Sequence, residues 1–374
     1  MMHSPFQPSR RLPRPLPYDR LAVVGAGSWG TALAIVAAHA GRRVGLLGRN
    51  ADEAAQMTRA RENARYLPGI PLPDLLDVTA DPAAALAPAE AVLIVTPSRV
   101  LRETAARLRP HLPEGLPLVL CCKGIEAESG LLLSEVLTEA LPGHPVGALS
   151  GPTFARETAL GQPTAATIAF PHAPREFVHP EESPAARLAV SFGSDGFRPY
   201  ISDDLTGVEI GGAVKNVIAL ACGMMTGAGY AENTRAALIS RGMDEMKRLA
   251  EALGGRRETV TGLSGAGDLT LTCSSTTSRN MKLGLQLGEG LPRAECFDGQ
   301  PVVVEGEVNA VSVVDLARRI GLSLPICEAV HAILTDGADL RATFAALWAS
   351  PLEAEPRGYD LMLHHPAAQP DPTR

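Results

Sequence analysis

The stretch LAVVGAGSWGTA, at residues 21–32, decides the fold because it joins a short apolar run to a glycine-rich turn and a helix. The apolar run at residues 21–24 predicts a buried strand, and the helical pattern at residues 31–40 ends at Gly41. A strand, a glycine-rich turn and a helix in this order form the first unit of a doubly wound α/β domain.

The turn has the spacing GxGxxG. The first glycine permits the tight turn, the second lets the backbone approach a pyrophosphate, and the third allows close packing of the helix, whose N-terminus faces the phosphates. Its place between a strand and a helix predicts dinucleotide binding, and the alternative is a turn chosen only for its geometry. The three glycines are Gly25, Gly27 and Gly30.

Further apolar runs predict later strands, and helical patterns lie between most of them. This alternation favours a parallel sheet, so we expect a Rossmann-like domain at residues 20–203. A proline-rich segment at residues 171–184 interrupts the pattern and is typical of a surface loop. The expected later strands cover residues 44–47, 91–95, 118–122 and 146–149.

From residue 204 onward long helical stretches predict a second, all-helical domain at residues 204–358. Two domains also fit a length of 374 residues, since single cores stop growing at roughly 250–300 residues. We expect residues 1–19 and 359–374 to be disordered extensions. The expected helices cover residues 207–225, 235–253, 281–287 and 307–320.

The formal net charge of −7 provides no basic surface for nucleic acid or an anionic membrane, so locally placed cations must hold any anionic ligand. Six cysteines without CxxC spacing favour a reducing cytoplasm, and we expect no metal. No run approaches the ~20 apolar residues of a membrane span, and residues 1–20 lack a signal-peptide hydrophobic region. A transit peptide is the alternative, because arginine and serine occur there without acids before Asp19.

The residue after the second predicted strand indicates which dinucleotide the domain can bind. NAD-specific domains usually place Asp or Glu there, where it bonds the ribose hydroxyls. Here the position holds Arg49, within Gly48-Arg49-Asn50. An arginine can pair with a 2′-phosphate, so the sequence favours, or at least admits, NADP(H) beside NAD(H). The alternative is a solvated arginine after a strand.

Two segments follow predicted strands directly. Lys123 comes after the strand at residues 118–122, and SGPTFA at residues 150–155 follows the strand at residues 146–149. Ligands of open α/β sheets bind beyond the carboxyl ends of the strands, so both segments are candidate parts of a site. Turn chemistry alone is the alternative for each.

The predicted helix EIGGAVKN, at residues 209–216, contains a lysine in an apolar setting. Gly211 and Gly212 lie one turn before Lys215, and each costs about 1 kcal/mol against alanine, so a helix or a ligand should pack closely there. A desolvated Lys215 would exchange its proton near neutral pH, as a general acid requires. The alternative is a lysine that extends from a packed helix into solvent.

Two later segments add polar groups. The loop GLSGAGD, at residues 262–268, ends in Asp268, which would orient a lysine or accept a bond from a substrate hydroxyl. Ser278-Arg279-Asn280 opens a helix, where a capping serine, an arginine and free backbone N–H groups suit a phosphate. An ordinary solvated helix start is the alternative.

Together these segments closely resemble the bacterial-type NAD(P)-dependent glycerol-3-phosphate dehydrogenase family. The N-terminal extension and the proline-rich segment lie outside the resemblance. The matching runs are GAGSWGTA at 25–32, CKG at 122–124, SGPTFA at 150–155, EIGGAVKNVIALACGM at 209–224, GLSGAGDLTLTC at 262–273, SRN at 278–280 and VVEG at 303–306.

The resemblance implies a C-terminal domain like that of 6-phosphogluconate dehydrogenase, and a homodimer. It implies reversible reduction of dihydroxyacetone phosphate to sn-glycerol 3-phosphate with NADH or NADPH, which feeds glycerophospholipid synthesis, and it makes Lys215 the catalytic acid and base. Substrate contacts would be Lys123, Gly151, Thr153, Lys215, Asp268, Ser278, Arg279 and Asn280. Cofactor contacts beside the three glycines would be Ser28, Trp29, Arg49, Lys123, Ala155, Arg279, Val303 and Glu305.

Two other functions are compatible with a two-domain plan of this kind. One is a related hydroxyacid or ketopantoate-type reductase that acts on a carboxylate, against which the phosphate site at residues 278–280 argues. The other is a non-catalytic NADP-binding regulator, against which Lys215 and Asp268 argue.

Overall fold

The computed structural model describes residues 14–350, which form two compact units. The sheet unit runs up to Cys122 and resumes at Ser134–Leu205, and the helical unit comprises Lys123–Leu133 and the chain from Thr206 onward. The contiguous boundaries expected from the sequence put residues 123–133 in the first domain. This segment groups with the helical unit because its apolar residues Ile125 and Leu132 join the core of that unit.

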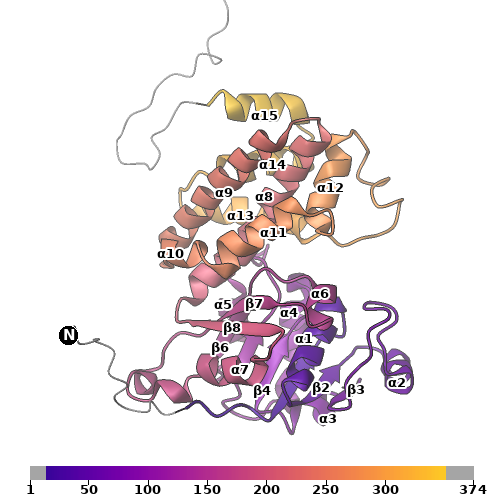
Figure 1. Ribbon diagram of the computed structural model, residues 1–374. Helices are drawn as coiled ribbons and strands as arrows, with labels where there is room; N and C mark the ends of the chain where they lie inside the picture. The colour runs from indigo at the N-terminus through magenta and orange to yellow at the C-terminus, as the bar shows by residue number, and fades with distance from the viewer. Residues whose placement is uncertain (1–13, 351–374) are drawn as a thin grey trace, which may run out of the picture. The chain divides into compact units, whose positions relative to one another are not determined.

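The sheet unit is built on an eight-stranded sheet with the order β3-β2-β1-β4-β5-β6-β7-β8 (Figure 1). The first six strands are parallel and have the order of doubly wound dinucleotide-binding domains, which confirms the predicted fold class. The sequence did not predict β3, β7 or β8; β7 is antiparallel to β6, and β8 is parallel to β7. The strands are β1 (Arg20–Val24), β2 (Arg43–Leu47), β3 (Leu76–Thr79), β4 (Ala91–Ile94), β5 (Leu118–Leu120), β6 (Val146–Ser150), β7 (Thr164–Ala169) and β8 (Phe197–Ser202).

Helix α1 (Ser28–His39) begins within the glycine-rich turn and is buried through most of its length. It packs against α6 and β2, so an apolar sequence around the whole helix is physically required. The other helices among residues 51–192 are α2 (Ala51–Ala60), α3 (Pro82–Leu86), α4 (Leu101–Leu108), α5 (Leu133–Ala140), α6 (Ala155–Ala159) and α7 (Pro184–Phe192).

The ordered chain begins before β1. Residues 1–13 of the expected N-terminal extension, and the whole expected tail at residues 359–374, lie outside the described residues. Tyr18 is buried, its N–H donates to Ser191 Oγ at 2.8 Å, and the Arg187 guanidinium lies 3.9 Å from the centroid of its ring. Tyr18 is therefore packed onto α7, although the sequence assigned it to a disordered extension.

The proline-rich segment at residues 171–184 forms two short 3₁₀ turns, η3 (Pro174–Phe177) and η4 (Pro180–Glu182). Phe177 and Val178 are exposed, as expected for a surface loop.

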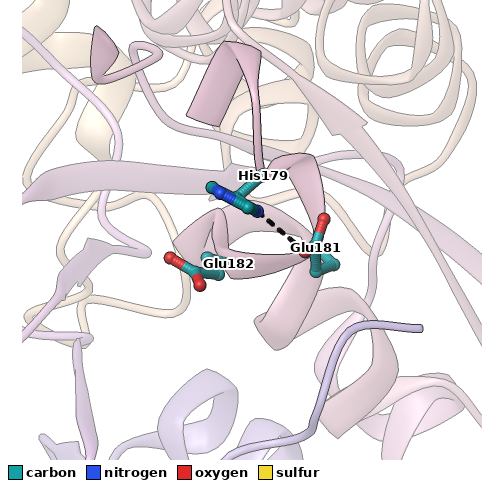
Figure 2. Close-up of side chains that lie close together, drawn as sticks. All are labelled: His179, Glu181 and Glu182. Atoms are coloured by element: carbon teal, nitrogen blue, oxygen red, sulfur yellow. Dashed lines mark hydrogen bonds and ion pairs between the residues drawn. The ribbon is translucent and has the colours of Figure 1, made fainter. Parts of the chain in front are cut away.

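The turn η4 brings His179, Glu181 and Glu182 together, with one potential metal-ligand atom of each within 4.8 Å of the others (Figure 2). His179 Nδ1 lies 3.4 Å from Glu181 Oε1. Arg175 Nε lies 2.7 Å from Glu182 Oε2. Both carboxylates therefore already have a partner within the protein: His179 lies beside Glu181, and Arg175 lies beside Glu182.

The helical unit is organised around α8 (Leu205–Gly227). By length and composition α8 could cross a membrane, which corrects the expectation that no segment approaches a span, yet its most apolar window is 100% buried inside the fold. A helix that other helices surround must be apolar on all sides. The other elements are α9 (Glu232–Ala252), α10 (Arg257–Val260), the π-helical turn η5 (Leu263–Gly267), α11 (Asp268–Ser274), α12 (Arg279–Gly288), α13 (Glu305–Arg319), α14 (Pro325–Thr335) and α15 (Leu340–Trp348).

Helices α8 and α12 approach each other backbone to backbone through glycines. A Cβ atom on Gly284 would lie 2.3 Å from the Leu220 oxygen, and one on Gly227 would lie 2.0 Å from the Leu285 oxygen. Real Cβ atoms do not approach backbone atoms so closely, so the two helices must separate if either glycine gains a side chain. This contact fixes α12 against the helix that carries Lys215.

We expect Gly284→Ala to lower the free energy of unfolding by about 1–3 kcal/mol, the usual cost of overpacking. The higher helix propensity of alanine, about 1 kcal/mol, acts in the opposite direction and does not remove the clash. Denaturant unfolding of the purified variant measures the change. Gly48→Ala is the matched control, because the nearest atom to its Cβ would be 3.8 Å away. Equal stability of the two variants would contradict the close contact.

Candidate functional site

Lys215 lies in the middle of α8 and is buried. One turn earlier, a Cβ on Gly211 would lie 2.7 Å from the Ser264 oxygen, so the missing side chain lets η5 pack directly on α8. The sequence predicted that something packs closely at this glycine, and the partner is the backbone of a loop. Turns of the π-helical type are frequent at functional sites.

The turn η5 leads into α11, whose first residue is Asp268. Lys215 Nζ donates to Asp268 Oδ1 at 2.8 Å, and Lys123 Nζ donates to Asp268 Oδ2 at 2.5 Å. The side chains of Lys215, Asp268 and Lys123 are 9%, 3% and 16% exposed. Three residues that the sequence singled out separately thus form one buried cluster, in which a single carboxylate serves two ammonium groups.

Burial and charge set the ionisation of the cluster. Burial lowers the pKa of Lys215; Asp268 opposes this shift and the charge of Lys123 adds to it. Burial alone would raise the pKa of Asp268, but the charges and hydrogen bonds of Lys123 and Lys215 outweigh it and lower that pKa. With all three groups ionised, the cluster carries one excess positive charge. An anionic group is its natural complement, because buried charge is costly unless it is paired.

Thr272 belongs to the cluster, although the sequence analysis did not single it out. Its Oγ1 accepts a hydrogen bond from Lys215 Nζ at 2.8 Å and donates one to Asp268 Oδ1 at 3.2 Å. Thr272 follows Asp268 by four residues, which places both side chains on one face of a helix. This spacing could have identified Thr272 from the sequence.

A second polar group joins α8 to the start of α12 and α13. Asn280 Nδ2 donates to Asn216 Oδ1 at 2.8 Å, and Asn280 Oδ1 accepts from the Gly306 N–H at 2.9 Å. Asn216 Nδ2 lies 3.5 Å from Glu305 Oε2. These bonds brace Asn280 and Glu305, two expected site residues, against Asn216, which the sequence analysis did not name.

The start of α12 has the form expected of an anion site. Ser278 caps the helix, with its Oγ accepting from the Met281 N–H at 3.3 Å. Arg279 is exposed, and no hydrogen bond or ion pair of its side chain is found among residues 14–350. Val303, which precedes α13, is 42% exposed.

In the sheet unit, the three glycines of the turn differ in the space around them. Gly25 has a φ of +116°, and a Cβ there would lie 2.8 Å from the Val95 oxygen. A Cβ on Gly30 would lie 1.9 Å from the Gly25 oxygen, whereas one on Gly27 would meet nothing within 4 Å. The turn is thus tightly packed on one side and open at its second glycine, which fits the close approach of a pyrophosphate.

Arg49 lies just beyond β2 and is exposed. Asn50 caps α2, with its Oδ1 accepting from the N–H groups of Asp52 at 2.8 Å and Glu53 at 3.1 Å. Both acids therefore lie in the first turn of α2, and Glu53 is paired with Arg65.

The loop after β6 also lies in the sheet unit. A Cβ on Gly151 would lie 2.8 Å from Ala166 Cα, so close packing of the backbone requires this glycine. Thr153 Oγ1 donates to the Gly151 oxygen at 3.3 Å, and Ala155 is the first residue of α6. The expected site residues therefore form two sets. Lys123, Lys215, Asp268, Ser278, Arg279, Asn280, Val303 and Glu305 lie in the helical unit, and the others lie in the sheet unit.

Models of one protein family match both units. The N-terminal model of NAD-dependent glycerol-3-phosphate dehydrogenase matches residues 20–175, and the C-terminal model matches residues 204–345. The chain belongs to the NAD-dependent glycerol-3-phosphate dehydrogenase family, which confirms the resemblance found in its sequence.

Individual relatives agree with this assignment. A Rhodospirillum rubrum protein named glycerol-3-phosphate dehydrogenase (NAD(P)+) is 45% identical over 354 residues, which are 95% of this chain and 99% of that protein. A Parvibaculum lavamentivorans protein of the same name is 47% identical over 340 residues, or 91% and 99% of the two chains.

Solved structures show the same architecture. The glycerol-3-phosphate dehydrogenase of Coxiella burnetii matches with a TM-score of 0.80 and 37% identity, over 88% of this chain and 98% of that one. A ketopantoate reductase from Ralstonia eutropha matches with a TM-score of 0.56 and 18% identity, over 88% and 99% of the chains, and shares the fold alone.

We expect Lys215→Ala to lower kcat for the reduction of dihydroxyacetone phosphate by about 100-fold or more, which is the usual effect of losing a positioned general acid. The Kd for NADPH should change little, because Lys215 donates its hydrogen bonds to Asp268 and Thr272 of its own helical unit. Steady-state kinetics and a fluorescence titration measure the two quantities. Lys247→Ala, on α9, is the control. A kcat near that of the wild type would remove Lys215 from the mechanism.

Proposed function

We propose that this chain catalyses the reversible reduction of dihydroxyacetone phosphate to sn-glycerol 3-phosphate with NADPH or NADH. The observation that carries the proposal is the buried cluster in which Asp268 faces both Lys215 and Lys123. Membership of the glycerol-3-phosphate dehydrogenase family supports the substrate, and the names of the relatives support the use of either cofactor.

The chemistry follows from the cluster. Reduction of a ketone requires a hydride at the carbonyl carbon, which the nicotinamide supplies when bound, and a proton at the carbonyl oxygen. Lys215 Nζ donates this proton to the developing alkoxide and takes it back in the oxidative direction. Because the pKa of Lys215 is lowered, the lysine can donate and accept a proton at a pH closer to neutral.

Asp268 and Lys123 assist Lys215 in different ways. Asp268 stays ionised, since its pKa is lowered, and its bond to Nζ orients the lysine. Lys123 adds a second positive charge, which favours the alkoxide over the neutral ketone. The excess positive charge of the cluster is thus matched to the charge that develops on the substrate oxygen.

Substrate phosphate binding is assigned to the start of α12. Arg279 can make charge-assisted hydrogen bonds to phosphate oxygens, and the first-turn N–H groups of the helix add further donors. This remote binding energy would position a three-carbon substrate for proton transfer. We assign further substrate contacts to Gly151, Thr153, Ser278 and Asn280.

The cofactor is assigned to the glycine-rich turn. The open side at Gly27 and the N-terminus of α1 suit its pyrophosphate, and Arg49 suits a 2′-phosphate, which favours NADP(H) beside NAD(H). We assign the remaining cofactor contacts to Ser28, Trp29, Lys123, Ala155, Arg279, Val303 and Glu305.

Two alternatives receive less support. A ketopantoate-type reductase would bind a carboxylate, and the likeness to such enzymes rests on the fold alone. A non-catalytic regulator would have no use for a buried charge cluster, which is costly to maintain. The proposal also includes a homodimer, which the family resemblance implies, and a cytoplasmic location, since six free cysteines fit a reducing compartment.

The wild-type protein should oxidise NADPH or NADH with dihydroxyacetone phosphate and not with ketopantoate. We expect Arg279→Ala to raise the KM for dihydroxyacetone phosphate at least tenfold, because a charge-assisted hydrogen bond contributes roughly 1.5–3 kcal/mol. Both experiments measure the absorbance of the reduced nicotinamide. Arg59→Ala, on α2, is the control. Turnover of 2-keto acids alone would contradict the proposed function, and an unchanged KM would place the phosphate elsewhere.

A further inference from the structure

We propose that Asn63 is a positioning residue for the dinucleotide pyrophosphate: its amide holds the Ala26 carbonyl and thereby aims the Gly27 N–H at the ligand. The inference rests on the proposed binding of NADP(H) or NAD(H) at the glycine-rich turn. Asn63 lies far along the chain from that turn and outside the seven runs that carry the family resemblance, although the N-terminal family model covers it.

Asn63 lies in the connection between α2 and β3 and is 2% exposed. Its Nδ2 donates to the Ala26 oxygen at 2.9 Å and to Thr31 Oγ1 at 2.7 Å. Its Oδ1 accepts from the Tyr66 N–H at 3.3 Å. Both amide hydrogens and the amide oxygen therefore have partners, which fixes the orientation of the side chain.

The segment that carries Asn63 is firmly held. Leu67, Ile70 and Leu72 are buried in the same core as α1 and β1. The Arg61 guanidinium donates to the oxygens of Leu76 and Leu72, each at 3.0 Å. The Asn63 amide thus reaches the glycine-rich turn from a rigid support, as a positioning residue requires.

The effect on the turn follows from peptide geometry. The Ala26 carbonyl and the Gly27 N–H belong to one planar trans peptide, so they point in opposite directions. When Asn63 holds the oxygen on the buried side, the N–H must face the other side. No protein acceptor is found for this N–H among the described residues, and a Cβ on the adjoining Gly27 Cα would also meet nothing within 4 Å.

The N–H groups next to Gly27 extend the same surface. Among the residues that the structure describes, the N–H groups of residues 27–30 find no protein acceptor. Free N–H groups at a helix N-terminus bind phosphate. Asn63 aims the first of these donors, so its loss should weaken ligands that contain the pyrophosphate and spare ligands that lack it.

The test compares Asn63→Leu, which keeps the number and branching of the side-chain heavy atoms and removes both donors, with Asn63→Ala. Calorimetry measures the Kd of NADPH, of 2′-phospho-ADP-ribose and of adenosine 2′-phosphate, which lacks the pyrophosphate. We expect the first two Kd values to rise about tenfold, equivalent to about 1.4 kcal/mol, and the third to change less than twofold. The KM for dihydroxyacetone phosphate, and kcat at saturating NADPH, should stay within about twofold of wild type.

Thr31→Val is the matched control, because it removes the other acceptor of the same amide and leaves the Ala26 bond in place. It should destabilise the fold and leave all three Kd values unchanged. Equal weakening of adenosine 2′-phosphate, or an equal effect of Thr31→Val, would overturn the proposal, as would failure of both Asn63 variants to fold. Absence of NADPH binding by the wild type would instead contradict the proposed function.

Discussion

The buried ion pair between Lys215 and Asp268 is the interaction on which the helical unit and its chemistry depend. Two charges can be taken out of water only if their geometry is good and their remaining donors and acceptors are satisfied. Thr272 and Lys123 help to meet this requirement, because Thr272 Oγ1 accepts a second hydrogen bond from Nζ and Lys123 Nζ donates to the second carboxylate oxygen. The pair in turn requires the π-helical turn η5 to lie directly on α8, which the absence of a side chain at Gly211 permits.

Close backbone contact at a glycine also occurs elsewhere in the protein. In the sheet unit Gly25 and Gly30 pack the turn tightly, so that the side at Gly27 can stay open. In the helical unit Gly284 lets α12 lie against α8, and α12 begins at Arg279. Close-packed main chain therefore sets the geometry of the candidate site, and it is more rigid than side chains that meet across a loop.

Local sequence patterns predicted much of this. The GxGxxG turn between a strand and a helix predicted the doubly wound domain. A lysine beside helix-interior glycines indicated the candidate site on α8. β7 was not predicted, because its TAATIA sequence contains three alanines and only one branched aliphatic residue, Ile168. The sequence analysis also missed the grouping of residues 123–133 with the helical unit, and Asn63. These depend on contacts between residues far apart in the chain, for which a single sequence contains no periodic signal.

The proposed role of Lys215 in catalysis requires a desolvated ammonium group with a lowered pKa. The most direct test is an NMR titration of the Lys215 side chain in ¹³C-lysine-labelled protein, assigned with Lys215→Arg and repeated in Asp268→Asn. The account predicts a pKa for Lys215 below the ordinary lysine value of 10.5, and a still lower pKa in Asp268→Asn, because burial and Lys123 lower it while Asp268 raises it. A Lys215 pKa at or above 10.5 in the wild type would contradict the account.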